Sequence, residues 1–293
     1  MFEFLGIAPQ ALFGQLLVGL INGAFYAMLS LGLAVIFGML NVINFTNGAQ
    51  YMLGAFAAWL LLTVLSVPFW IALVLSPLLV GLFGVVIERL LLKRLYHLDH
   101  LYGFLLTFGL ALVIEGIFQY KWGSSGQPYP NPIPGGYNLG FMFLPTYRAF
   151  VVVFALVVCL ATWYAIERTR LGGYLRVATE NPTLVQAFGI NVPKLITLTY
   201  GLGVGLAALA GVMAAPIYQV SPLMGQNLVL IVFAVVVIGG MGSIMGSIVT
   251  GFGLGLVEGL TKVFYPQASS TVIFVIMAVV LLIKPAGLFG QAR

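Results

Sequence analysis

Charge is the property that this sequence most lacks. Only 6% of its 293 residues are charged, and no Asp, Glu, Lys or Arg occurs from Phe4 to Ile87 or from Leu195 to Val257. A soluble domain needs charged side chains spread over its surface to stay in solution. These two stretches therefore exclude a soluble domain and indicate that lipid is the solvent for most of the chain.

Several motifs are missing as well. The single cysteine, Cys159, cannot form a disulfide within the chain, and no lysine follows a glycine, which excludes the phosphate-binding sequence G-x-x-x-x-G-K-[ST]. There is no H-E-x-x-H sequence and no Cys/His cluster, since His97 and His100 stand alone in a charged segment. We therefore expect no catalytic residue, no metal site and no cofactor bound by this chain, which argues against a membrane enzyme.

Apolar residues, in contrast, make up 61% of the chain, and its mean hydropathy is +1.12. Runs such as Phe150–Tyr164 are apolar at both odd and even positions, which favours helices over barrel strands. Because a helix needs about 20 residues to cross a membrane, we expect an all-α polytopic integral membrane protein of about nine spans, with eight to ten as limits. It forms a single transmembrane domain over residues 1–293. The predicted spans are 11–37, 48–66, 69–88, 101–120, 148–166, 195–215, 228–246, 248–264 and 271–284.

The basic residues predict the orientation of these spans. Segments 88–100 and 167–194 are the most charged connections, and two spans separate them, so they lie on the same side. That side and the C-terminal tail hold Arg89, Lys93, Arg94, Arg168, Arg170, Arg176, Lys194, Lys284 and Arg293, against Lys121, Arg148 and Lys262 opposite. The positive-inside rule then places the C-terminus in the cytoplasm and, for nine spans, the N-terminus outside. Because the positive charge lies between spans, it does not indicate nucleic acid.

Both ends of the predicted bundle carry a distinctive connection. Residues 121–148 contain five prolines and are expected to form an external loop, which either caps the bundle or offers a surface to an external partner. At the other end, Asn181 and Pro182 predict the start of a short helix and Gly189 its left-handed end. Leu184, Val185 and Phe188 share one face of this helix, which either docks into a partner or lies on the membrane surface.

Uncharged polar residues interrupt the apolar pattern between the first two spans. Amides and a hydroxyl exposed to hydrocarbon would each cost several kcal/mol, so they face protein, water or a solute. This favours a path for a neutral or zwitterionic solute, although a simple cytoplasmic turn is the alternative. The candidate path residues in this segment are Asn41, Asn44, Thr46, Asn47 and Gln50.

A second interruption, in the other half of the chain, is rich in glycine and serine. It predicts either a helix that ends inside the membrane beside the path or close packing of two helices. The candidate path residues here are Gly239, Gly240, Gly242 and Ser243. Glu115 is expected near the outer end of its span, and Glu258 is followed by Lys262 one turn later as an interfacial pair. No isolated carboxylate is predicted at mid-membrane, which argues against proton coupling.

The polar segments together resemble one family of transporters. Arg168–Gly172, Arg176–Pro182 and Ala187–Asn191 look like the cytoplasmic loop of ABC-importer permeases for branched-chain amino acids, of the LivH type. Gly38–Gly54 and Val237–Ser243 are similar to that family as well, and the likeness covers nearly the whole chain.

The resemblance implies an ABC importer permease fold in the bacterial inner membrane, in contact with lipid. Its partners would be a homologous second permease, two cytoplasmic ATPases that bind ATP and Mg²⁺, and a periplasmic solute-binding protein. The loop within residues 167–194 would couple the permease to the ATPases, with matching positions at Glu180, Asn181, Pro182, Ala187 and Gly189. Leu184 and Phe188 complete the candidate docking residues. The older importer signature E-A-A-x-x-x-G is only loosely present, because Ala187 and Gly189 stand too close together.

The function expected is transport of leucine, isoleucine and valine by alternating access, powered by the separate ATPase subunits. Urea or another small polar solute is the alternative within the same transporter class. A secondary carrier that works without an ATPase is the alternative from a different class.

Overall fold

The computed structural model describes residues 9–40, 44–96, 98–140, 142–180 and 182–290. The elements are α1 (Pro9–Leu40), α2 (Thr46–Leu65), α3 (Phe69–Leu90), η2 (Leu92–Arg94), α4 (His100–Trp122), β1 (Gly136–Asn138), β2 (Phe143–Pro145), α5 (Thr146–Glu167), α6 (Arg170–Glu180), α7 (Pro182–Ala187), α8 (Val192–Tyr218), α9 (Gln226–Gly239), α10 (Ile244–Phe264), η3 (Pro266–Ala268) and α11 (Thr271–Ile283). The expected all-α architecture is confirmed, with one small hairpin in addition.

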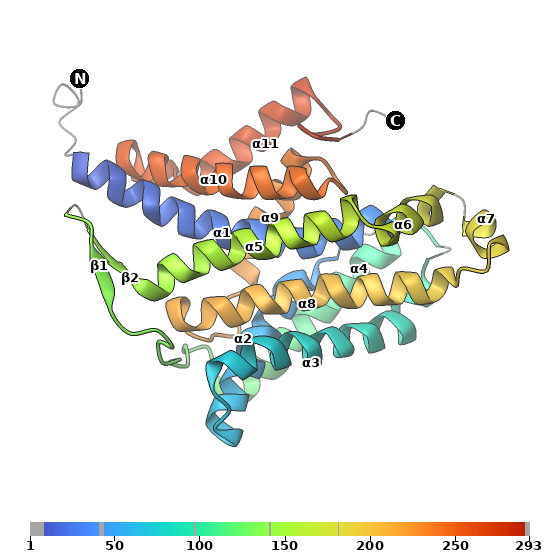
Figure 1. The fold of residues 1–293 in the computed structure, drawn as a ribbon, viewed down its shortest axis with the longest axis horizontal. Helices are drawn as coiled ribbons and strands as arrows, with labels where there is room; N and C mark the ends of the chain where they lie inside the picture. The colour runs from blue at the N-terminus through green and yellow to red at the C-terminus, as the bar shows by residue number, and fades with distance from the viewer. Residues whose placement is uncertain (1–8, 41–43, 97, 141, 181, 291–293) are drawn as a thin grey trace.

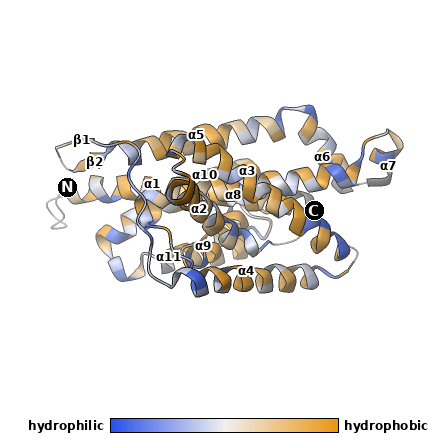
Figure 2. Cartoon of the chain, turned by 90° about the horizontal axis from the view of Figure 1, so that it is seen from below, coloured by the Kyte–Doolittle hydropathy of each residue, from blue (hydrophilic) through white to orange (hydrophobic). Residues whose placement is uncertain are grey.

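The long helices form a bundle whose two ends differ (Figure 1). One end carries the β1–β2 hairpin and the other carries α6 and α7. Hydrophobic residues run along the outer helices α4 and α5, and hydrophilic residues gather near α6 and α7 (Figure 2). Many outward-facing side chains of α3, α4 and α5 are large and apolar, among them Val74, Leu105 and Val153. This surface suits a lipid environment.

Seven helices in the described parts of the chain are long and apolar enough to cross a membrane: α1, α2, α3, α4, α5, α8 and α10. Apolar helices also stand at the two remaining predicted spans, but α9 has 14 residues and α11 has 13. At 1.5 Å per residue each is about 20 Å long, shorter than the ~30 Å of hydrocarbon. Nine helices therefore occupy the predicted positions, while nine full crossings are not confirmed.

Small residues allow the central helices to approach closely. A Cβ added to Gly54 on α2 would stand 2.1 Å from the carbonyl oxygen of Ala208 on α8, so only glycine fits there. On α1, a Cβ at Gly19 would stand 2.4 Å from the carbonyl oxygen of Gly255 on α10. Without a hydrophobic driving force between helices in lipid, such backbone contacts are a main source of packing energy. The α2–α8 and α1–α10 pairs thus form the centre of the bundle.

Helix α2 begins inside the bundle rather than at its end. Asn47, in its first turn, donates from Nδ2 to the carbonyl oxygen of Leu29 at 3.2 Å. Leu29 lies eleven residues before the C-terminal end of α1, which corresponds to about 16 Å along the helix. Phe45, just before α2, donates its backbone N–H to Thr107 Oγ1 on α4 at 3.2 Å. The polar start of α2 is therefore surrounded by α1, α4 and α8.

The predicted external loop packs against the bundle. Gln127 and Val220 exchange backbone hydrogen bonds of 2.8 and 2.9 Å, which tie the loop to the connection between α8 and α9. β1 pairs antiparallel with β2, with Tyr137 opposite Leu144. Tyr129 packs its ring on Phe69 at the start of α3, and burial raises the pKa of the Tyr129 hydroxyl to about 12. The loop covers this end of the bundle.

Candidate functional site

The polar side chains at the start of α2 form a buried, hydrogen-bonded cluster. Asn44, Thr46, Asn47 and Gln50 are each at most 1% exposed. Asn44 Oδ1 accepts from the backbone N–H of Thr46 at 3.1 Å and from the Thr46 hydroxyl. Asn44 Nδ2 donates to Gln50 Oε1 at 3.3 Å, and Gln50 Nε2 donates to Thr46 Oγ1 at 2.9 Å. We call these four residues the amide cluster.

The amide cluster uses nearly all of its hydrogen-bonding capacity within the fold. Gln50 Nε2 also donates to the Tyr200 hydroxyl at 3.4 Å. One atom, Asn47 Oδ1, is buried without a partner among the described residues. Asn41, the remaining candidate of this segment, lies outside the described residues. The segment is thus buried protein interior in this state, and its contact with a solute stays a prediction.

The glycine-rich segment forms a tight turn between α9 and α10. Gly240 and Gly242 have φ angles of +101° and +86°, which glycine adopts without strain. Gly239 ends α9, and Ser243 begins α10 by accepting the backbone N–H of Gly246 on its hydroxyl at 3.1 Å. A Cβ at Gly242 would stand 3.1 Å from the Cα of Gly38, near the end of α1. These four candidates therefore shape a turn at the α6–α7 end of the bundle.

The C-terminal segment closes this turn from outside. Leu288 and Phe289 donate their backbone N–H groups to the carbonyl oxygens of Ile238 and Gly239 at 2.8 and 3.0 Å. Lys284 Nζ in turn donates to the carbonyl oxygen of Leu288 at 2.7 Å. The last carbonyl oxygens of a helix receive no N–H from within that helix, and these two bonds supply donors to those of α9.

The predicted docking segment contains two helices rather than one. Helix α7 lies where the sequence predicts it, and Gly189 ends it with φ +80°, but α6 precedes it and was not predicted. Phe188 is 78% exposed and Leu184 49%, whereas Val185 packs into a small core with Ala178. Of the three residues on the predicted apolar face, Phe188 and Leu184 are therefore exposed and Val185 is buried.

The other docking candidates are placed only in part. Ala187 and Gly189 are exposed beside Phe188. Asn181 and the side chains of Glu180 and Pro182 lie outside the described residues. The segment is followed directly by α8, whose first turn begins where Asn191 Oδ1 accepts the backbone N–H of Lys194 at 3.1 Å. A force on α7 would therefore reach α8 through a connection of only a few residues.

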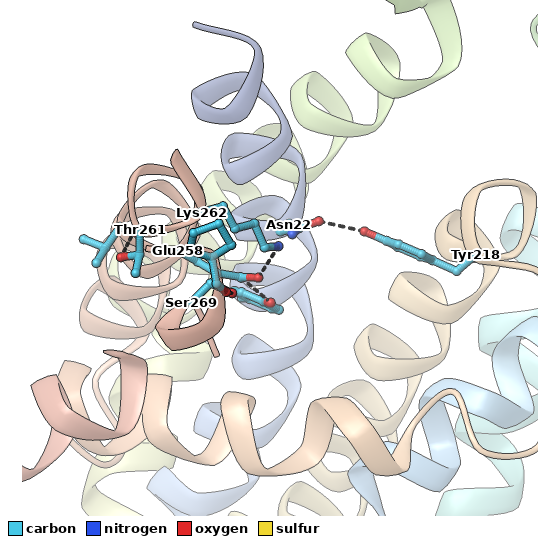
Figure 3. A network of polar contacts seen from close by, with 9 residues as sticks. Asn22, Tyr218, Glu258, Thr261, Lys262 and Ser269 are labelled. Carbon is cyan, nitrogen blue, oxygen red and sulfur yellow. Dashed lines mark hydrogen bonds and ion pairs between the residues drawn. The ribbon is translucent and has the colours of Figure 1, made fainter. Parts of the chain in front are cut away.

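A hollow of about 400 Å³ opens beside the buried part of α2. It is lined by Asn22, Phe25, Tyr26, Tyr51, Tyr218, Ser221, Leu223, Met224, Asn227 and Leu228. These residues come from α1, from α2 and from the junction between α8 and α9. Tyr218 donates its hydroxyl to Asn22 Oδ1 at 2.8 Å across this space (Figure 3). A volume of this size is typical of small-molecule sites.

A buried charge pair stands behind one wall of the hollow (Figure 3). Glu258 on α10 accepts from Tyr26 at 2.6 Å and from Lys262 Nζ at 2.5 Å. The predicted Glu258–Lys262 pair is therefore formed near the C-terminal end of α10, with Glu258 buried and Lys262 partly exposed. Because the carboxylate and the ammonium neutralise each other, this wall presents no net charge to the hollow.

A second buried carboxylate lies at the α6–α7 end of the bundle. Glu88 is 1% exposed and accepts hydrogen bonds from the hydroxyls of Tyr96 at 2.7 Å and Thr197 at 2.8 Å. Burial, followed by the bond to Glu88, raises the pKa of the Tyr96 hydroxyl above its usual value. Glu88 thus links the end of α3 to the connection that follows it and to the first turns of α8.

The hollow is the part of the site that the sequence did not predict. Asn22 and Asn227 are the signals that could have revealed it, because both are amides in charge-free apolar stretches. Tyr51 and Tyr218 carry no such signal, since tyrosines are common in membrane helices. In the described residues, no group of three His, Cys, Asp or Glu side chains could hold a metal ion.

The site and the fold together define a membrane permease. The chain matches, over residues 15–283, the family described as "Branched-chain amino acid transport system / permease component", and it belongs to that family. The resemblance drawn from the polar segments is thereby confirmed. Seven long apolar helices and this membership make the chain a multi-pass permease subunit of the inner membrane.

Individual proteins are similar to this chain over most of its length. The chain is 29% identical to the high-affinity branched-chain amino acid transport system permease protein BraD of Pseudomonas aeruginosa, over 94% of this chain and 95% of the relative. It is 25% identical to the corresponding protein LivH of Escherichia coli K12 over the same shares. Among solved structures, PsaBC from Streptococcus pneumoniae in complex with Fab aligns over 91% of this chain and 89% of that chain, with a TM-score of 0.48 and 14% identity.

Proposed function

We propose that this chain moves branched-chain amino acids across the membrane as a subunit of an ABC importer, and that it carries no catalytic residue itself. The family match over residues 15–283 is the observation that carries this proposal. The neutral polar lining of the hollow supports it, because a zwitterion needs hydrogen-bonding groups of both kinds and no net counter-charge.

The proposed partners are a homologous second permease, two cytoplasmic ATPases and a periplasmic solute-binding protein. The ATPases would dock on α7, where Phe188 and Leu184 are exposed at a polar end of the bundle. On the other side of the helix, Val185 packs in one cluster with Val192, the first residue of α8. A displacement of α7 would therefore displace the start of α8 as well. The binding protein would meet the end that carries β1 and β2.

Alternating access would follow from movement of α8. This helix touches α1, α2 and α3 in the bundle, and its C-terminal end reaches the hollow at Tyr218. ATP-driven closure of the ATPases would change which side the path is open to, and solute moves inward only if the outward-facing state binds it more tightly than the inward-facing state. Because contacts such as Gly54 against Ala208 pack α2 closely on α8, we expect these two helices to move together.

Reconstitution of the complete importer in proteoliposomes tests the function. We expect ATP-dependent uptake of leucine, isoleucine and valine, and no uptake of urea. Uptake of urea instead would reassign the substrate. Solute flux driven by an ion gradient through this chain alone, without any ATPase, would contradict the importer function and favour a secondary carrier.

A second experiment tests the docking role of α7. Phe188→Asp together with Gly189→Asp should abolish leucine uptake while the complex still inserts and its ATPases still hydrolyse ATP. Leu98→Asp is the matched control, because Leu98 is also an exposed apolar side chain, at 45%, but lies between η2 and α4 and outside α7. Normal uptake by the double variant would refute docking through α7.

A further inference from the structure

The hollow contains polar groups that the fold itself does not use. Among the residues that the structure describes, the Tyr51 hydroxyl and the Asn227 side chain make no hydrogen bond, although Tyr51 is only 1% exposed. Asn22 accepts from Tyr218 on Oδ1 and leaves its Nδ2 donor free within the same set of residues. Polar groups left open inside a membrane protein cost free energy unless water or a solute satisfies them.

The start of α9 adds one open backbone donor to the hollow, the N–H of Asn227. Gln226 donates to the carbonyl oxygen of Leu223, and Leu228 and Val229 both donate to that of Gly225. The backbone N–H of Asn227 has no acceptor among the described residues. The positive end of the α9 dipole therefore lies at the hollow, where it favours an anionic group.

The depth of this part of the hollow excludes a lipid environment for it. A Cβ at Gly225 would stand 1.9 Å from the carbonyl oxygen of Gly48, in the first turn of α2, so α9 starts at the level of the amide cluster. Asn227 is nevertheless exposed. An amide exposed to hydrocarbon at that depth would be costly, so the hollow opens to water or to the second permease.

The rest of the lining is apolar. It includes Phe25, Leu223, Met224 and Leu228, and no Asp, Glu, Lys or Arg among the described residues lines the hollow. A ligand that matches both parts of the lining has a polar head of zero net charge and an aliphatic body. Glu258 is held away from the hollow by Tyr26 and Lys262, so it offers no free carboxylate to a cationic solute.

We propose that the hollow binds a zwitterionic aliphatic amino acid during transport, with its carboxylate at the start of α9 and its side chain on Phe25 and Leu228. Asn22 and Tyr51 then contact the polar head. This inference rests on the proposed function and deepens it, because it gives the permease a binding site of its own in addition to that of the solute-binding protein.

Cysteine labelling in the assembled importer tests the proposal. The native Cys159 is fully buried, so it contributes no background. In Asn227→Cys, a water-soluble maleimide should label position 227, and L-leucine at about ten times its Kd should slow labelling about tenfold, because only about a tenth of the sites then stay free. Isoamylamine, which has the same aliphatic chain but no carboxylate, should not slow it. Leu98→Cys, at an exposed position between η2 and α4, is the control and should be labelled equally fast with and without leucine.

Transport by two further variants provides a second measurement. Asn227→Asp should lower leucine uptake about tenfold through a higher KM, because its charge repels the carboxylate, and Asn227→Gln should keep most of the uptake. If the importer takes up leucine but leucine leaves labelling of Asn227→Cys unchanged, or if that cysteine is never labelled, the inference is wrong and the proposed function stands. If the unmodified importer takes up no branched-chain amino acid, the proposed function is wrong and this inference falls with it.

Discussion

Two polar regions meet on α2, and they differ in how they use their hydrogen bonds. Gln50 belongs to the amide cluster, where donors and acceptors are bonded to one another, whereas its neighbour Tyr51 faces the hollow with an unused hydroxyl. Both regions are uncharged and lie inside the bundle. A polar residue in a membrane helix therefore does not by itself mark a transport path; an unsatisfied one that also lines a hollow is the better marker.

The difference also separates two roles of α2. In the cluster, side-chain bonds fix where the helix starts and which neighbours it touches. At the hollow, the same helix presents a group that only a solute or water can satisfy. We therefore expect substitutions in the cluster to lower stability and substitutions in the hollow to alter transport.

The largest loss of stability is expected at the contact between Gly54 on α2 and Ala208 on α8. This contact fixes the position of α2, which carries both the amide cluster and one side of the hollow. Gly54→Leu would force a side chain against the backbone of Ala208, and overpacking of this kind costs about 1–3 kcal/mol or more. Because backbone cannot move aside as a side chain can, we expect little folded protein, measured by size-exclusion chromatography in detergent. Gly253→Leu is the control, since a Cβ at Gly253 meets nothing within 4 Å. A monodisperse Gly54→Leu with normal melting temperature would contradict this assignment of α2.

The next prediction compares the two regions directly. Asn44→Ala removes partners of Thr46 and Gln50 and should destabilise the protein by about 1–3 kcal/mol, the cost of leaving buried polar groups unpaired. Asn227→Ala, by contrast, removes no bond of the described fold and should change stability by less than about 0.5 kcal/mol. Thermal unfolding in detergent measures both. If the two variants lose the same unfolding free energy, the hollow stabilises the fold as much as the amide cluster does, and the proposed difference between them is wrong.

The sequence alone predicted the positions of the long helices but did not predict the hollow, and the reason is physical. Apolar runs must become helices in lipid because their backbone groups have no other partners, so all nine predicted positions are helical. The short length of α9 was missed, since the predicted span 228–246 continues past Gly239, where α9 ends. The prediction 271–284 for α11 agrees with the observed helix within one residue. Helix α6 was missed because Gly172 and Gly173 lower its propensity and its position depends on contact with α5.

The candidate residues show the same limit. The sequence reveals that Asn44, Asn47 and Gln50 need partners, but which partners depends on the crossing of α2 with α1 and α8. It could not reveal that Asn22, Tyr51 and Asn227 meet, because they come from three elements far apart in the chain. Helix termini with glycine, such as the end of α7 at Gly189, were predictable because they depend on local backbone geometry alone.

A third prediction concerns the charge pair behind the hollow. Lys262→Met leaves Glu258 without its cation and should cost about 2 kcal/mol, less than for a fully buried pair because Lys262 is a third exposed. Adding Glu258→Gln should restore most of that loss, since the amide oxygen can still accept from Tyr26. A double variant as unstable as Lys262→Met alone would show that the lysine acts by packing rather than by charge.

The smallest effect on stability is expected at Tyr218, where stability and transport should also respond most differently. Tyr218→Phe removes a partly exposed hydrogen bond to Asn22, worth about 0.5–1.5 kcal/mol at most, and keeps the ring contact with Phe25. In the hollow, however, the freed Asn22 oxygen changes the pattern offered to the polar head of the solute. We expect the melting temperature to stay nearly constant while the KM for leucine changes several-fold in reconstituted importers. If the loss of stability and the change in KM correspond to the same free energy, Tyr218 stabilises the fold, as the amide cluster does, and does not contact the solute.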